Sequence, residues 1–239
     1  DVFLVRGDMA HGYADTERMS LVNILYDPDV LRLPTADLKR LPGYHVLFRV
    51  EPRMRRRHRF RGRLRLSRDQ LAEAALLITQ LENELESAKA GCRFMASAHL
   101  MHLIGYLSRC LTDVRQPERH PLYRLGEVLS YIEHHYDEPL TVAQLAAMAA
   151  MSESTLARTF RQVTGHAPLD YVIRTRVARA AELLRQDDLL ITDVALACGF
   201  SDTNYFSRQF RRVMGTAPRA YRRSLSASRP GATSRGRAR

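Results

Sequence analysis

Apolar positions change their spacing along the chain, and each spacing predicts a different kind of structure. Residues 1–66 hold short apolar runs, among them VFLV, SLVNILYD and LPGYHVLFRV, separated by proline and glycine. Short runs bounded by turn residues are typical of β-strands. From Ser67 onward the apolar positions recur every three or four residues, which indicates helices. The pattern therefore predicts a β-rich front segment followed by helices.

The first predicted helix begins after Ser67, its expected N-cap, and ends at Gly91. Steps of three and four residues give it a narrow apolar seam, made by Leu71, Ala74, Ile78, Leu81, Leu85 and Ala88. A second helix is expected at about 93–112. Because seams of this kind pair helices between subunits, we expect the first five of these residues to form a homodimer interface. Packing of the two helices on the β-rich segment is the alternative.

One stretch near the carboxyl end occurs twice. The segment STLARTFRQVTGHAPLDYVI at 154–173 is a weaker copy of DTNYFSRQFRRVMGTAPRAYRR at 202–223. Aligned without gaps from 155 and from 205, eight of seventeen positions are identical. Each copy predicts a short helix, a tight turn and a second helix, which together make a helix-turn-helix.

Capping residues place the ends of these helices. Thr141 and Gln144 form a predicted capping box for the first short helix. Ser152 is the expected cap of the second helix, and Gly165 ends it. A long helix that begins at Pro168 is expected to hold the two units at a fixed separation.

The second helix of each copy has an apolar and a polar face. The apolar faces, predicted to be core, are Leu156, Phe160 and Val163, and Phe206, Phe210 and Val213. The opposite faces carry Ser154, Ala157, Arg158 and Arg161, and Asn204, Ser207, Arg208 and Arg211. Short polar residues followed by arginines suit a helix in the major groove of DNA. A merely solvated charged face is the alternative, but the same face recurs in both copies.

The charge of the chain points to the same partner. The formal net charge is +11, and nearly all of the positive charge is arginine, because lysine occurs only at 39 and 89. Arginine binds phosphates and guanine edges, so nucleic acid is the leading partner class. Between 202 and 223 six arginines accompany one acidic residue, Asp202.

Cysteine usage and hydropathy suggest where the chain works. The cysteines, Cys92, Cys110 and Cys198, have no CxxC spacing and fit a reducing cytoplasm. No run of eighteen apolar residues indicates a membrane span, and the first residues do not resemble a signal peptide. The chain begins inside a predicted strand, so we expect earlier strands to be missing from it.

Residues from about 124 to 223 resemble the DNA-binding domain of the AraC/XylS family of bacterial transcription regulators. The strongest match is DVALACGFSDTNYFSRQFRRVMGTAPRAYR at 193–222. The resemblance implies an all-helical domain whose two recognition helices enter successive major grooves of double-stranded DNA. The base-reading residues that it implies are Ser154, Ala157 and Arg158, and Asn204, Ser207 and Arg208. We expect Arg161, Arg211, Arg212, Arg222 and Arg223 to contact phosphates.

The front segment resembles ligand-sensing domains. DVFLVRGDMAHGY is similar to part of a cupin barrel motif in which His11 would be a metal ligand, but Arg6 and Asp8 replace the usual proline and glycine. We therefore expect no metal and no other cofactor. The stretch from LVNILYD to LPGYHVLF resembles the sugar-sensing family members, in particular the rhamnose regulators, which implies a small sugar-like effector.

These expectations combine into an α+β fold class with five segments. They are a truncated cupin-like β-domain (1–66), a helical pair (67–112), a linker (113–121), a double helix-turn-helix domain (122–223) and a disordered basic tail (224–239). The Arg-rich stretch at 51–65 is interpreted as a basic loop, with a phosphate contact or an effector-binding wall as alternatives.

The predicted function is a sequence-specific, effector-responsive transcription regulator rather than an enzyme. A cupin-type enzyme or a DNA-repair protein would need a metal triad or an activated cysteine, and His11 stands alone in the sequence. A sequence-indifferent architectural protein is disfavoured because the two recognition faces differ in detail. Asp202 is interpreted as a helix cap or as a contact to RNA polymerase.

Overall fold

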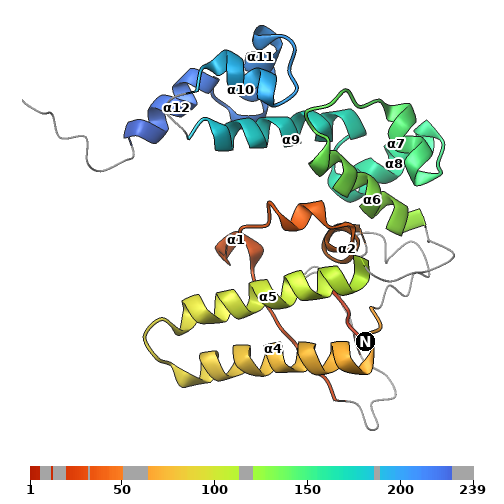
Figure 1. Ribbon diagram of the computed structural model, residues 1–239, viewed down its shortest axis with the longest axis vertical. Coiled ribbons are helices and arrows are strands. Elements are labelled where there is room, and N and C mark those ends of the chain that lie inside the picture. Colours follow the sequence, from red (N-terminus) through yellow and green to blue (C-terminus); the bar gives the residue numbers. More distant parts are fainter. Residues whose placement is uncertain are drawn as a thin grey trace, which may run out of the picture.

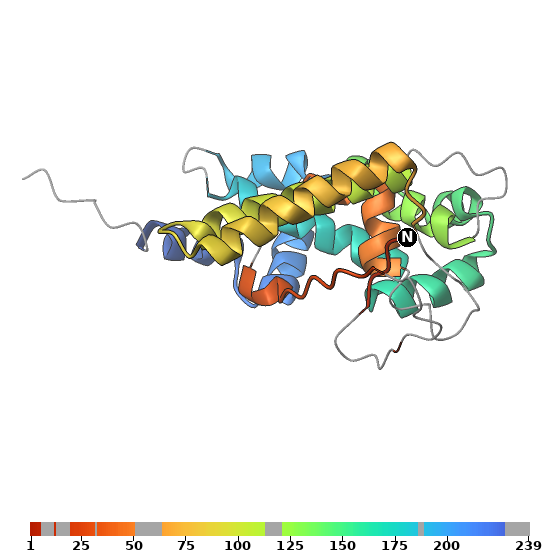
Figure 2. The ribbon, with the colours of Figure 1, turned by 90° about the horizontal axis from the view of Figure 1, so that it is seen from below.

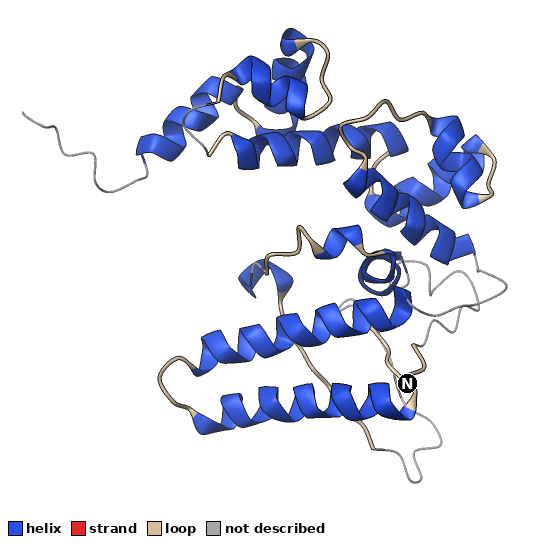
Figure 3. Ribbon diagram, viewed as in Figure 1, coloured by secondary structure: helices blue, strands red, loops and turns tan. Residues whose placement is uncertain are grey.

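The computed structural model describes residues 1–5, 12, 20–31, 33–50, 64–112, 121–185 and 189–227, and the description below concerns these residues. Helices and loops make up the described chain (Figure 3). An antiparallel pair of long helices, α4 and α5, lies apart from the helices of the carboxyl-terminal half, with shorter helical turns between them (Figure 1). No described helix is long and apolar enough to cross a membrane.

The front half contains short helical turns and then the long pair. Its elements are α1 (Pro28–Leu31), η1 (Leu38–Arg40), α2 (Pro42–His45), the π-helical η2 (Val46–Val50), α4 (Arg68–Ser87) and α5 (Cys92–Thr112). Ser67 is the N-cap of α4, as predicted: its hydroxyl accepts from the Gln70 amide at 3.2 Å, and the Gln70 side chain accepts from the Ser67 amide at 2.9 Å.

The carboxyl-terminal half consists of seven helices among the described residues. They are α6 (Pro121–His134), α7 (Val142–Ala149), α8 (Glu153–Thr164), α9 (Pro168–Leu183), α10 (Ile191–Ala197), α11 (Thr203–Met214) and α12 (Pro218–Ala227). Helix α12 extends past residue 224, where the basic tail was expected to start, and residues 228–239 lie outside the described chain. Most of the expected linker, 113–120, lies outside it as well.

The predicted α+β class is wrong for the described residues, which contain no strand and no cupin-like β-domain. The β-type contact found among them is a single antiparallel bridge between Val2 and Leu64. The stretch LPGYHVLFRV, predicted to be a strand, is helical from residue 42 to residue 50. Its buried residues Val46, Leu47 and Val50 are spaced as on one face of a helix. A short apolar run fits a strand or a helix equally well, and tertiary packing decides between them. His11 and most of the Arg-rich stretch lie outside the described residues.

Helix α2 and η2 lie where the two halves meet. A Cβ atom on Gly43 would overlap the carbonyl oxygen of Ser108 in α5, and one on Gly126 in α6 would lie 2.5 Å from the Val46 side chain. The two glycines therefore let α2 and η2 approach α5 on one side and α6 on the other. Val50 is fully buried in the same core as Leu125. The front half thus contributes a side chain to the core of the first helix-turn-helix.

Helix α4 packs along α5, as a view from a second direction also shows (Figure 2). The residues of α4 that are buried in this contact are Ala74, Leu77 and Leu81. The apolar seam predicted for α4 is therefore partly buried within the chain and partly exposed. Ala74 and Leu81 lie inside the chain, whereas Leu71 and Leu85 are 54% and 59% exposed. Ile78 is half-buried between the two groups.

Candidate nucleic-acid interface

Two helix-turn-helix units, α7–α8 and α10–α11, are joined by α9 (Figure 1). The capping box of Thr141 and Gln144 is present, and the Ser152 hydroxyl caps α8 by accepting from the Thr155 amide at 3.2 Å. Gly165 ends α8 in the left-handed conformation, with φ of 80°. These predicted helix ends are confirmed.

Asp202 caps the second recognition helix, α11. Its carboxylate accepts a hydrogen bond from the Tyr205 amide at 2.8 Å. This hydrogen bond holds the pKa of Asp202 below its usual value. The exposed carboxylate is thus fixed at the positive end of α11.

The two recognition helices, α8 and α11, bury one face and expose the other. Leu156, Phe160, Phe206 and Phe210 are fully buried, and Val163 is nearly so. The predicted core positions are confirmed except that Val213 is only partly buried. On the opposite faces Ser154, Arg158, Arg161, Asn204, Arg208 and Arg211 are exposed, whereas Ala157 and Ser207 are half-buried. The Arg208 guanidinium lies over the Tyr205 ring, 5.9 Å from its centre.

Arg176 of α9 links the loop that leads into the first unit to the turn of the second unit. Its guanidinium donates to the carbonyl oxygens of Tyr136 (2.5 Å), Glu138 (2.8 Å) and Gly199 (2.7 Å). The first two residues lie between α6 and α7, and the third lies in the turn between α10 and α11. Three hydrogen bonds from one planar group hold the loop between α6 and α7 against the turn of the second unit. This role of Arg176 could not be predicted, because nothing in the sequence distinguishes Arg176 from the other arginines of α9.

The turn of the second unit requires glycine. Gly199 has φ of 77°, and a Cβ atom there would overlap the backbone of Asp137. In the first unit Ala150 takes the left-handed position, with φ of 50°, so the absence of glycine did not prevent the turn. The close approach at Gly199 again joins the second unit to the loop after α6.

The five arginines that were expected to contact DNA phosphates differ in how far their guanidinium groups are free to do so. Arg212 of α11 donates to the Asp170 carboxylate at 2.6 Å, and Arg174 donates to the same carboxylate at 2.9 Å. Burial raises the pKa of Asp170, but these two hydrogen bonds outweigh burial and leave the pKa below its usual value. Two guanidinium nitrogens of Arg222 are covered by the protein. By contrast, Arg161, Arg211 and Arg223 are exposed and form no ion pair with another described residue.

Two of the three cysteines, Cys110 and Cys198, are buried. Cys198 is fully buried, and burial raises the pKa of its thiol to about 11, which leaves no thiolate for catalysis at neutral pH. None of the three cysteines forms a disulfide. Across the described ranges, no three histidine, cysteine or acidic side chains cluster closely enough to hold a metal.

Known proteins with similar sequences are transcription activators. Residues 145–224 match the model of a family described as a helix-turn-helix domain. The chain is 30% identical over 228 residues to the HTH-type transcriptional activator RhaS of Escherichia fergusonii, a match that covers 95% of this chain and 77% of that protein. It is 28% identical over 223 residues to the HTH-type transcriptional activator RhaR of Enterobacter sp. (strain 638), with 93% and 75% covered.

A solved structure, the DNA-binding domain of AdpA in complex with a target DNA, aligns with 45% of this chain and 96% of that chain. The identity in this alignment is 42% and the TM-score is 0.42. The curated relatives are named as activators, in agreement with the prediction of a regulator rather than an enzyme. The chain therefore belongs to the AraC family of helix-turn-helix transcription activators and binds double-stranded DNA.

Proposed function

We propose that this activator reads its binding site through α8 and α11 in two successive major grooves. The proposed base-reading residues are Ser154, Ala157 and Arg158 on α8, and Asn204, Ser207 and Arg208 on α11. The observation that carries the proposal is the matching exposed face on both helices, each supported by fully buried aromatic or leucine side chains. Short side chains at the amino-terminal end let a helix approach base edges, and arginine donates to guanine.

Phosphate contacts are proposed for the exposed arginines Arg161, Arg211 and Arg223. Arg212 and Arg222 were expected to act with them, but Arg212 is ion-paired with Asp170 and part of the Arg222 guanidinium is covered. We expect these two to contribute less to DNA affinity. Arg212 instead ties α11 to the start of α9, and so helps to orient the recognition helix.

Three further features of the regulator are proposed. A small effector, sugar-like by the resemblance of the front segment, controls its activity. A homodimer forms through α4, where Leu71 and Leu85 are exposed. Asp202 contacts RNA polymerase with its exposed carboxylate. The protein works in the cytoplasm, where promoter DNA is found.

The test of the function is the ratio of specific to non-specific DNA affinity at one salt concentration. Genome-wide footprinting, with and without candidate sugars, supplies the operator. A specific regulator should bind the operator at least about 1,000-fold more tightly than random DNA. Equal affinity for both would point to an architectural protein. A sugar that changes operator occupancy would identify the effector class.

A further inference from the structure

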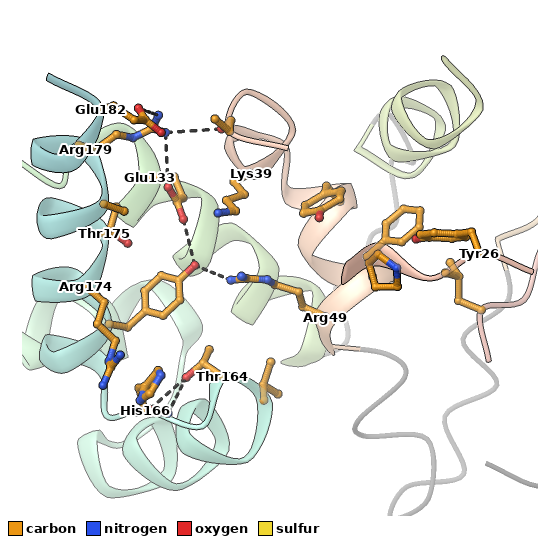
Figure 4. A pocket seen from close by; sticks show the side chains of 18 of the residues that line it. Tyr26, Lys39, Arg49, Glu133, Thr164, His166, Arg174, Thr175, Arg179 and Glu182 are labelled. Carbon is orange, nitrogen blue, oxygen red and sulfur yellow. Dashed lines mark hydrogen bonds and ion pairs between the residues drawn. The ribbon is translucent and has the colours of Figure 1, made fainter. Parts of the chain in front are cut away.

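A cavity of about 840 Å³ lies between the front half and the first helix-turn-helix unit (Figure 4). One wall comes from η1 and η2 and carries Lys39 and Arg49. The other wall comes from Glu133 of α6 and from α9, which contributes Tyr171 and Arg179. The end of α8 closes one side through Thr164. A volume of this size suits a small metabolite.

The charges that line the cavity are unbalanced. The ionised lining residues are four cations and two carboxylates, namely Lys39, Arg49, Arg174, Arg179, Glu133 and Glu182. Both carboxylates lie near Arg179, with distances of 3.2 Å for Glu182 and 3.6 Å for Glu133. Arg174 is bound to Asp170, outside the lining set. The two cations of the front half are left without a carboxylate partner among the described residues.

Arg49 is held in place by two buried groups, Tyr171 and, through it, Glu133. Its Nη1 donates to the Tyr171 hydroxyl at 2.6 Å, and its guanidinium lies over the Tyr171 ring, 5.7 Å from the centre. The Tyr171 hydroxyl in turn donates to Glu133 at 3.0 Å. This chain of hydrogen bonds fixes one edge of the Arg49 fork. The other nitrogens of Arg49 form no hydrogen bond with the described residues, and are suited to a bidentate anion.

Lys39 points toward the same part of the cavity (Figure 4). Burial is the main cause that lowers the pKa of Lys39. The negative charge of Glu133 opposes it, with a smaller contribution from Glu182, and the positive charges of Arg49 and Arg179 lower the pKa further. Its ammonium forms no ion pair or hydrogen bond with the described residues. Burial removes water from the Lys39 ammonium, and a bound anion would stabilise its charge in place of that water.

We propose that this cavity binds a small organic anion, bearing phosphate or carboxylate, between Lys39 and Arg49. The planar fork of arginine and the point charge of lysine are the usual pair for such groups. The anion would join η1 and η2 to α9, the helix that joins the two DNA-reading units. Binding therefore fixes the front half against the DNA-binding half. The proposal deepens the effector proposal of the preceding subsection and rests on it only for this regulatory consequence.

The experiment uses the full chain and two independent measurements. Isothermal titration calorimetry at constant ionic strength measures binding of inorganic phosphate and citrate, with L-rhamnose as an uncharged comparison. We expect saturable binding of at least one anion, weakened about tenfold or more in Lys39→Met and in Arg49→Met. Lys89→Met is the matched control, since Lys89 is the other lysine of the chain and lies exposed after α4. Its affinity should equal that of the wild type.

The second measurement needs no variant and so does not depend on the folding of one. Acetic anhydride modifies the wild-type protein, and mass spectrometry quantifies acetylation at Lys39 and Lys89. The bound anion should slow modification of Lys39 several-fold and leave Lys89 unchanged.

Binding of phosphate but not citrate, or the reverse, would support the proposal and assign the anionic group. Absence of binding for both anions, equal protection of both lysines, or rhamnose binding that depends on Lys39 would overturn it. Operator affinity, measured on the same preparation without ligand, tests the DNA-reading function separately.

Discussion

At the scale of single residues, His45 is the most unusual titratable group among those described. It is fully buried, and its Nε2 lies 2.6 Å from the Lys39 carbonyl oxygen, to which the neutral ring donates. Its Nδ1 has no hydrogen-bond partner. Burial, assisted by the positive charge of Arg49, lowers the pKa of His45 to about 3. The folded protein therefore keeps this ring neutral at every physiological pH.

This buried ring predicts a loss of stability in mild acid. In the unfolded chain the histidine side chain has its ordinary pKa of 6.5 and gains a proton as the pH falls below that value, whereas the buried ring stays neutral down to about pH 3. The free energy of unfolding is therefore highest above pH 6.5 and falls as the pH drops from 6.5 toward 3. Between pH 7 and 5.5 the free energy of unfolding should fall by about 1 kcal/mol through this residue. Urea unfolding at both pH values, for wild type and His45→Gln, isolates the effect. The variant should have the shallower pH dependence, and equal slopes would show that His45 is not responsible.

Asp202 allows a prediction that separates folding from transcription. Asparagine is as good an N-cap as aspartate, so Asp202→Asn should leave stability and operator affinity unchanged. If the carboxylate contacts RNA polymerase, transcription in a purified system should fall at matched DNA occupancy. Full activation by the variant would leave Asp202 with the capping role alone, which the Tyr205 hydrogen bond already shows.

At the scale of elements, the sequence predicted the helix-turn-helix units well and the front half poorly. In α8 and α11 the apolar spacing, the caps and the terminal glycines all indicate the same structure, and these local signals were sufficient. In residues 42–50 the local pattern was ambiguous, and helix α2 with η2 is selected by packing on α5 and α6. The link at Arg176 and the cavity at Lys39 depend on contacts between distant segments, which leave no local signal.

Glycine substitutions test the junction between the two reading units. Gly215 and Gly199 both have φ of 77°, but a Cβ atom meets nothing within 4 Å at Gly215 and overlaps Asp137 at Gly199. Gly215→Ala should therefore cost about 1 kcal/mol from the left-handed backbone alone. Gly199→Ala should cost about twice that or more, since the Asp137 backbone must also move. Chemical unfolding of both variants measures the two losses of free energy of unfolding. Equal losses would mean that the close contact between Gly199 and Asp137 does not constrain the junction.

At the scale of the whole molecule, the spacing of the apolar residues in α4 predicts a helix with one apolar face, but not the partner on which that face packs. A regular heptad pattern does not say which of its residues face a helix of the same chain. The structure uses Ala74 and Leu81, with Leu77, for contact with α5, and leaves Leu71 and Leu85 outside. The apolar residues that remain exposed are those on which the dimer prediction now depends.

Charges introduced at the exposed leucines of α4 test the dimer. We expect the wild type to sediment as a dimer at micromolar concentration and the double variant Leu71→Glu, Leu85→Glu to sediment as a monomer. An interface cannot bury unpaired carboxylates without a large loss of free energy. Leu76→Glu is the control, because Leu76 is similarly exposed at 53% but lies elsewhere around the helix. A monomeric wild type with intact operator binding would rule out this interface.

The central claim is that one chain reads two separate parts of its operator with two linked helices. The most direct measurement is the affinity of wild type, Arg158→Ala and Arg208→Ala for a set of operators, each with one base pair changed. Each variant should lose about 1–3 kcal/mol of binding free energy to the intact operator and become indifferent to one base pair. The two base pairs should lie about 10 base pairs apart, one helical turn. Equal losses on operator and random DNA, or relaxation at the same base pair by both variants, would contradict the account.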